Sequence, residues 1–247
     1  MNNLTFPEGI TYKYKYTTSG DFIPTGHNAG VSMAYAYFAR ENRIIEILYD
    51  TSNVTNMSYM FNGCVNLNSI SQLDTSNVTN MNNMFYNCSG LTSIPQLDTS
   101  KVTTMSNMLE SCKNLPTIPQ LDTSNVTSMD SMFRYCSILT TIPQLDCSKV
   151  TSIGMFGYGG NTSIVNLGGF KNLGMQKSVS NTSGNYFLYA SSKLTHESIM
   201  NVINNLYDRK SAGYSVLTLK LHANTLTLLS DEEKAIATNK GWTLATS

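Results

Sequence analysis

Residues 74–81 read DTSNVTNM, and the pattern recurs along the middle of the chain. It stands at residues 50–57 as DTSNVTNM, at 98–105 as DTSKVTTM, at 122–129 as DTSNVTSM and at 146–153 as DCSKVTSI. Successive units begin 24 residues apart without a slip. A fixed period of this length is typical of a solenoid, because one unit cannot bury its apolar face alone and must stack on copies of itself. We therefore expect an α/β solenoid over residues 46–167.

Apolar residues keep fixed places inside each unit, mostly three residues apart, and this spacing fits a chain that turns continuously. A short strand is predicted around one isoleucine column, and it must be brief because a proline follows in three units and cannot donate to a ladder. A helical turn is predicted on the opposite side, around the Val and Met columns. The strand centres are Ile70, Ile94, Ile118 and Ile142.

Four cysteines share one place in the unit, so stacking brings them into a column. Adjacent coils lie about 5 Å apart, but stacked Cβ vectors run parallel rather than converging as a disulfide requires. Buried free thiols are therefore the favoured interpretation, and four sulfurs in a row do not form a tetrahedral zinc site. The column is Cys64, Cys88, Cys112 and Cys136.

The aspartate that opens each unit has two interpretations. It can cap the following backbone as an Asx-turn or helix N-cap, or the column can bind calcium. Capping is favoured because it explains a periodic aspartate without a metal. A glutamine column, Gln72, Gln96, Gln120 and Gln144, predicts an amide ladder.

The two ends of the chain do not repeat. Residues 1–45 contain the alternating stretch Thr11–Tyr16 and a strand candidate at Val31–Phe38. They are expected to form a β-rich cap, or an attachment or oligomerisation segment that uses exposed tyrosines. Residues 168–247 predict larger strand-helix coils that extend and close the parallel sheet. The signals there are a helix from Thr195, a strand at Leu217–Leu221, a capping box from Ser230, a glycine C-cap at Gly241 and a last strand at Trp242–Ala245.

Composition excludes several classes of partner. The net charge is zero and only 13% of residues are charged, so no basic stripe is available for nucleic acid. No apolar run is long enough to predict a membrane span, and residues 1–7 do not read as a signal peptide. His27, His196 and His222 have no metal-ligand spacing, and no nucleophile or phosphate-loop motif is present. We expect no enzyme activity, no metal and no cofactor.

The repeat also carries a resemblance. Residues 85–95 (FYNCSGLTSIP) followed by LDTS at 97–100 resemble the leucine-rich repeats of BspA-type bacterial surface proteins. Residues 235–243 (AIATNKGWT) are similar to the ending of gut-bacterial surface proteins and of tail or fibre proteins of their phages. The resemblance implies a leucine-rich-repeat arc with short parallel strands and a binding role without catalysis.

Two classes of function follow from these patterns. The first is a recognition module, carried by a phage virion or displayed as a bacterial cell-surface adhesin, that binds a bacterial surface glycan or protein. The second is a virion spacer without a ligand. Other virion proteins are expected to bind through the N-terminal segment, and self-association stays open. The candidate ligand-binding residues are Tyr86 and Tyr135 at variable places in the unit, and the outward hydroxyl column Ser69, Ser93, Thr117 and Thr141.

Overall fold

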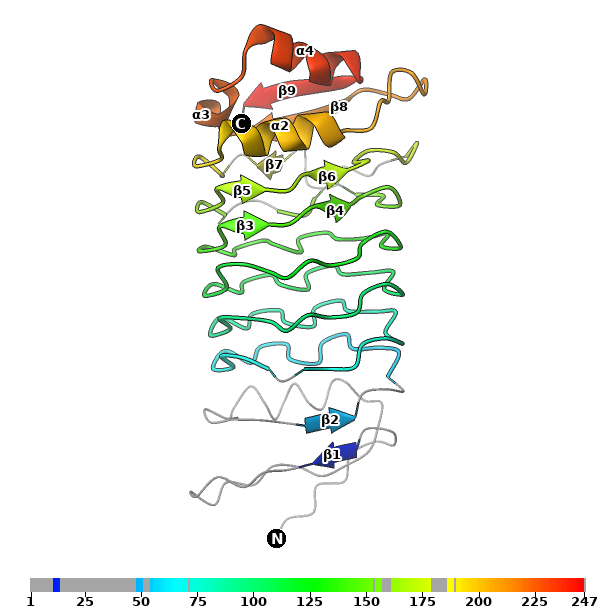
Figure 1. Ribbon diagram of the computed structural model, residues 1–247, viewed down its shortest axis with the longest axis vertical. Helices are drawn as coiled ribbons and strands as arrows, with labels where there is room; N and C mark the ends of the chain where they lie inside the picture. The colour runs from blue at the N-terminus through cyan, green and yellow to red at the C-terminus, as the bar shows by residue number, and fades with distance from the viewer. Residues whose placement is uncertain are drawn as a thin grey trace.

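The computed structural model describes residues 11–13, 48–50, 54–70, 72–152, 154–156, 161–178, 186–188 and 190–246. Successive 24-residue units lie one above another along the long axis of the molecule, and the C-terminal helices lie at one end (Figure 1). Near the other end, β1 (Thr11–Lys13) pairs antiparallel with β2 (Leu48–Asp50). The strand candidate at Val31–Phe38, the rest of residues 1–45 and the side chains of β1 lie outside the described residues.

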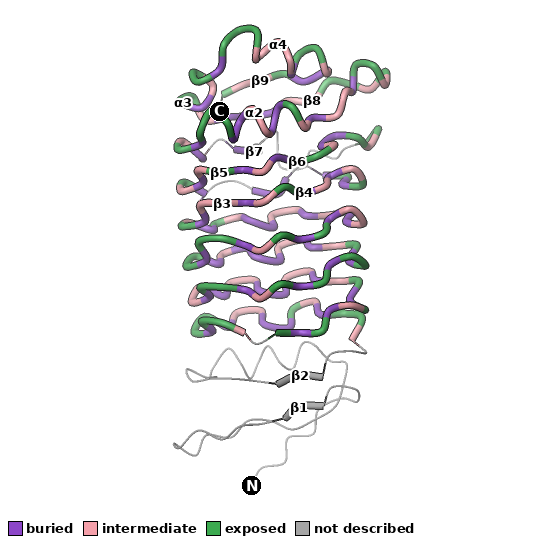
Figure 2. The backbone as a smooth tube through the Cα atoms, viewed as in Figure 1, coloured by how far each residue is buried: buried purple, intermediate pink, exposed green. Residues whose placement is uncertain are grey.

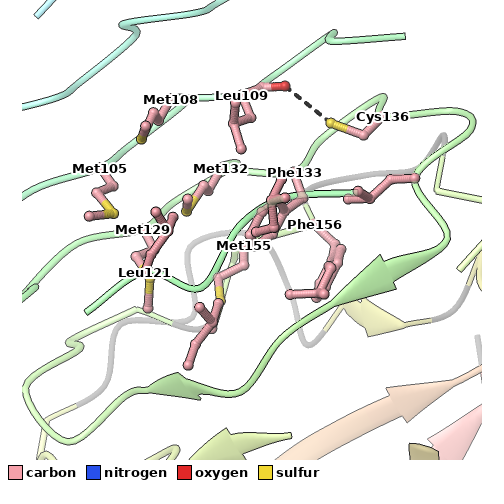
Figure 3. Packing of buried hydrophobic residues seen from close by; sticks show 14 of the residues in the cluster. Met105, Met108, Leu109, Leu121, Met129, Met132, Phe133, Cys136, Met155 and Phe156 are labelled. Carbon is pink, nitrogen blue, oxygen red and sulfur yellow. Dashed lines mark hydrogen bonds between the residues drawn. The ribbon is translucent and has the colours of Figure 1, made fainter. Parts of the chain in front are cut away.

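The apolar columns face the interior of the stack, as the repeat pattern predicted (Figure 2). Side chains from neighbouring units contact one another along the axis, so that Met105 lies by Met129 and Leu109 by Phe133 (Figure 3). Phe61 and Phe85 stack with their ring centroids 5.4 Å apart and their planes 1° from parallel. Each unit thus buries its apolar side chains only by lying against the next. The fully buried columns include Val78, Val102 and Val126, Met81, Met105 and Met129, and Leu91, Leu115 and Leu139.

The Val and Met columns do not form the predicted helical turn. On this side of each coil, which we call the Met side (residues 55–63 and their equivalents), alternate N–H groups donate to the neighbouring coil. The N–H of Met81, for example, donates to the carbonyl oxygen of Thr104 in the next coil at 3.0 Å. The N–H of Met84 donates instead to the carbonyl oxygen of Met81 in its own coil. Alternating turns and intercoil bonds require positive φ at fixed places in the unit, which are Tyr59, Asn83, Asn107 and Ser131, and Gly63, Asn87, Ser111 and Tyr135.

These bonds make the Met side a parallel ladder. Bridges join Asn56 to Asn80, Asn80 to Thr104 and Thr104 to Ser128, each between residues one period apart. A threonine one place before this column reinforces it, since Thr103 donates to the carbonyl oxygen of Thr79 through both its backbone N–H (2.9 Å) and its hydroxyl (3.1 Å). The intercoil hydrogen bonds therefore satisfy backbone groups that a helix would have satisfied internally.

The opposite side, which we call the Ile side (residues 68–73 and their equivalents), carries fewer strands than the sequence predicts. β3 (Thr141–Ile142) pairs in parallel with β5 (Asn166–Leu167), and β4 (Leu145–Asp146) with β6 (Phe170–Lys171). No strand forms at Ile70, Ile94 or Ile118, where the described residues show one bridge, Thr117 to Thr141.

Proline explains the difference. The N–H of Gly168 donates to the carbonyl oxygen of Ile142 at 2.9 Å and completes the ladder between β3 and β5. Pro95, Pro119 and Pro143 have no N–H to donate from the equivalent place in the earlier units. Gly168 also has no room for a side chain, because an added Cβ would lie 2.3 Å from the backbone nitrogen of Gln144.

Side chains supply some of the missing bonds on the Ile side. Gln96 donates its amide to the backbone carbonyl oxygen of Gln120 at 2.7 Å, and the glutamines before and after it do the same. The amide ladder predicted between glutamine side chains therefore does not form, because each amide bonds to the backbone carbonyl of the next glutamine. The aspartate column forms Asx-turns, as predicted: Asp98 accepts from the Ser100 N–H at 3.0 Å and from the Ser100 hydroxyl at 2.7 Å.

All five cysteines are free and buried. The thiols of Cys88, Cys112 and Cys136 donate to the carbonyl oxygens of Phe61, Phe85 and Leu109, 27 residues earlier, at 2.9–3.1 Å; Figure 3 draws the last of these bonds. Burial raises the pKa of Cys136 to about 12 and that of Cys88 and Cys112 well above the ordinary value.

We expect these thiols to react slowly with an alkylating reagent in the native protein, because the column is buried and protonated at neutral pH. After denaturation without reductant, all five should react at once. Mass spectrometry of the labelled chain measures both states, and cysteines that react only after reduction would contradict the free-thiol column.

The described residues of the C-terminal part form three helices and a sheet. Helix α2 (His196–Asn205) begins at Thr195, whose side chain accepts from the Ser198 N–H. Helix α3 (Ala223–Leu226) is short, and α4 (Asp231–Asn239) begins with the predicted capping box of Ser230 and Glu233. The strands β7 (Tyr186–Leu188), β8 (Leu217–Leu221) and β9 (Trp242–Thr246) are all parallel, in the order β7-β8-β9.

Among the described residues this sheet is separate from the Ile-side pairs, and one parallel bridge, Leu173 to Leu206, continues the stack beyond β6. Helix α2 lies against β5 and β6 (Figure 1). The Ser198 hydroxyl bonds the carbonyl oxygen of Val165 and the N–H of Leu167, and the Asn201 amide donates to the carbonyl oxygen of Leu167 at 3.1 Å. Polar side chains of α2 thus satisfy the edge that a further strand would have paired.

Candidate functional site

Tyr86 and Tyr135 occupy adjacent places in the repeat unit, at the end of the Met side. They belong to units two coils apart, so about 10 Å of stack axis separates their backbones. Tyr86 is half-buried and Tyr135 is 38% exposed.

Tyr135 is held in an unusual conformation. Its φ of 59° falls in the left-handed region, at a place that Gly63, Asn87 and Ser111 occupy in the earlier units. A bulky residue is disfavoured there by about 1 kcal/mol. The Arg134 guanidinium lies 4.6 Å from the Tyr135 ring centroid and also donates to its hydroxyl at 3.0 Å. The ring is thus fixed against its neighbour instead of turning freely in solvent.

Glu110 is paired with the arginine that holds Tyr135, and it was not among the predicted site residues. It occupies the place between Tyr86 and Arg134 in successive units, is 6% exposed, and forms an ion pair with Arg134 at 3.4 Å. Burial raises the pKa of Glu110, and the charge of Arg134 opposes that rise. The sequence signal for this pair was the variability of its column, which holds Asn62, Tyr86, Glu110 and Arg134.

An open pocket of about 430 Å³ lies beside Tyr135. Its lining comes from two neighbouring units: Ser111 and Lys113 from one, Tyr135 and Ser137 from the next. The Ser137 hydroxyl donates to the carbonyl oxygen of Lys113 at 3.2 Å. We call this surface the Tyr135 edge, defined as Tyr86, Glu110, Ser111, Lys113, Arg134, Tyr135 and Ser137.

The predicted hydroxyl column lies on the Ile side. Ser69, Ser93 and Thr117 are exposed and Thr141 is half-buried, with a parallel bridge from Thr117 to Thr141. None of the four lines the pocket beside Tyr135. The hydroxyl column and the tyrosines therefore do not form one site.

A second pocket, of about 320 Å³, lies at the other end of the Ile side. Asp122, Asp146 and Lys171 line it, and Lys171 forms an ion pair with Asp146 at 3.2 Å. Hydrogen bonds from Ser76 and Ser100 lower the pKa of Asp74 and Asp98, so these carboxylates are ionised with local donors. Among the described residues, no group of three or more His, Cys, Asp or Glu side chains is placed to hold a metal ion.

A protein family matches the chain. The family model described as "Mycoplasma protein of unknown function, DUF285" matches residues 31–137 and 87–162, and together these ranges exceed half of the 247 residues. The chain belongs to the DUF285 family. The match agrees in coarse terms with the resemblance to BspA-type surface repeat proteins, and it covers every residue of the Tyr135 edge.

The DUF285 match does not extend to the C-terminal helices, and so it does not bear on the phage-like ending. No curated protein and no solved structure matches the chain. Among the described residues, no helix is both long and apolar enough to cross a bilayer.

Proposed function

We propose that this DUF285 chain is a non-enzymatic recognition module whose Tyr135 edge binds a glycan or a protein on a bacterial surface. The observation that carries the proposal is Tyr135 itself. It keeps a disfavoured backbone conformation, is fixed by Arg134 and lines an open pocket. The intercoil bonds of the Met side set this conformation in every unit, and at Tyr135 they present an aromatic ring beside the pocket.

The chain's architecture in this proposal is an α/β solenoid of the leucine-rich-repeat type. Residues 46–167 form the repeats, residues 1–45 form a cap or attachment segment, and residues 168–247 close the stack. The parallel bridges and hydrogen bonds between places one period apart support it. Such a scaffold presents equivalent side chains at regular steps along an extended surface, which suits a long ligand.

Two settings for the module rest on different observations. The assignment to a phage virion, as a tail or fibre protein, rests on the resemblance of residues 235–243. Other virion proteins would then bind residues 1–45. A bacterial adhesin is favoured by the DUF285 match. Antibodies raised against the purified chain distinguish the two settings, since they would label either phage particles or intact bacterial cells. A spacer without a ligand would show no attachment in the experiment below.

Combining Tyr135→Gly with Tyr86→Ala is expected to weaken attachment of the purified protein to bacterial cells by at least tenfold, because aromatic anchors carry much of the energy of such contacts. Its melting temperature should change by only a few degrees, because glycine removes the strain of about 1 kcal/mol at residue 135. Flow cytometry with labelled protein measures attachment, and calorimetry measures stability.

Tyr59→Gly is the matched control. Tyr59 also has positive φ (63°) and is 48% exposed, but it does not line the pocket. The control should relieve similar strain and leave attachment unchanged. Attachment that survives in the double variant would assign binding to the hydroxyl column instead, and a wild-type protein that attaches to no cells in a broad panel would support the spacer.

A further inference from the structure

We propose that the pocket beside Tyr135 takes an acidic sugar, the carboxylate-bearing unit of a glycan that runs across the coils. This inference rests on the proposed function and deepens it by naming the class of ligand. Its physical basis is the combination of one uncompensated cation, a fixed aromatic ring and two hydroxyls in the same open pocket.

The charge in the pocket comes from Lys113. Its side chain lines the pocket and forms no ion pair with a described residue. The nearest acid in the repeat pattern, Glu110, is already paired with Arg134 and is 6% exposed. The ammonium group of Lys113 is therefore available to a ligand carboxylate, which it would bind through a charge-assisted hydrogen bond.

The other lining groups suit a sugar ring. Tyr135 presents a ring whose orientation Arg134 fixes, so little side-chain freedom is lost when an apolar sugar face packs on it. The Ser137 hydroxyl donates to a carbonyl oxygen and keeps its own oxygen free to accept. Ser111 adds a second hydroxyl from the neighbouring unit. Hydroxyls paired with an aromatic ring give directional contacts to a polyol.

The repeat sets the direction of the glycan. One sugar unit in an extended chain is about 5 Å long, close to the spacing of about 4.8 Å between adjacent coils. A glycan that runs across the coils would thus place successive rings near successive units, and a ring two units away would reach Tyr86. Because Lys113 is the one cation lining this pocket, the ligand is a mixed glycan with an occasional acidic unit and not a uniform polyanion.

The test uses the full chain and immobilised oligosaccharides that contain uronic or sialic acid, each beside its own methyl ester. The ester keeps the sugar backbone and removes the charge. At least one acid should bind about tenfold more tightly than its ester, and Lys113→Gln should abolish that preference, since hydrogen bonds to charged groups are the stronger kind. Lys101→Gln is the control, because Lys101 is exposed, hydrogen-bonds to Asn77 and does not line the pocket.

Attachment to bacterial cells is measured in parallel, so that failure of this inference is distinguished from failure of the proposed function. If the protein attaches to cells but prefers no acid to its methyl ester, the acidic sugar alone is overturned. A preference for an acid that Lys113→Gln leaves intact would also overturn it. Attachment destroyed by protease treatment of the cells but not by periodate would overturn it in favour of a protein ligand. Absence of attachment to any cell would overturn the proposed function as well.

Discussion

A rise in pH from 8 to 10 is expected to lower the free energy of unfolding by several kcal/mol through four buried cysteines, at roughly 1 to 2 kcal/mol each. Burial raises the pKa of Cys88, Cys112, Cys136 and Cys147 in the folded chain, to about 12 for Cys136. A loss of this size equals much of the stability of an ordinary domain. Circular dichroism during urea titrations at both pH values measures the change.

The sign follows from where the protons are held. In the unfolded chain a thiol loses its proton near pH 8.5 to 9, whereas the buried thiols keep theirs. The stability contributed by the raised pKa is complete below that pH. It falls as the pH rises towards the folded pKa.

Cys112→Ala isolates the effect from the tyrosines and lysines that titrate in the same range. The variant should be less stable than the wild type at pH 8, because it loses a buried sulfur and its hydrogen bond to Phe85. Its further loss between pH 8 and 10 should be smaller than that of the wild type by roughly 1 to 2 kcal/mol. An identical pH dependence in variant and wild type would contradict a protonated thiol column.

Phe85→Ala is expected to destabilise the stack by about 3–5 kcal/mol, the usual range for removing a buried aromatic side chain. Phe85 is fully buried and stacks on Phe61 with nearly parallel planes. Because each coil contacts only its neighbours, the loss should be concentrated around that unit. Hydrogen exchange should rise most for the Met-side amides of residues 57–63 and 81–87.

Phe85→Leu provides the matched comparison, since Leu109 occupies the same place in the next unit and is fully buried. The leucine variant should lose no more than about 1.5 kcal/mol, because it keeps most of the side-chain volume. Equal losses for alanine and leucine would mean that the aromatic stack, and not the filled volume, holds this coil.

The sequence predicted the interior of the repeats well because burial follows directly from the period. Local sequence also predicted the buried cysteine column, the Asx-turn at Asp98 and the start of the helix at Thr195. The first two follow from the repeat, and the third follows from the capping preference of threonine. Such features need no knowledge of how the coils sit on one another.

The Met-side ladder could not be predicted from the sequence of one unit. Apolar residues at Val78 and Met81 fit the period of a helix as well as that of a turning chain, and only the intercoil bond from Met81 to Thr104 distinguishes them. The strand at Ile142 likewise depended on Gly168, which is in the following coil and supplies the N–H that proline lacks elsewhere.

The candidate site was predicted in part. Tyr86 and Tyr135 were found because their columns vary, but the pocket depends on the close approach of two units. Lys113 and Tyr135 lie 22 residues apart in sequence and line it together. Variability also marked Glu110 and Arg134, although it gave no sign that these side chains form an ion pair.

Hydrogen bonding between coils is unequal on the two sides of the stack. Between the units that begin at Asp74 and Asp98, the Met side carries backbone bonds from Thr103, Met81, Asn83, Phe85 and Asn87, whereas on the Ile side Gln96 bonds through its side chain. Pro116 has no N–H at the place from which Thr92 and Thr140 donate. Tension along the axis should therefore part the coils first on the Ile side, with the Met side acting as the hinge, so the molecule would bend in one direction before it breaks.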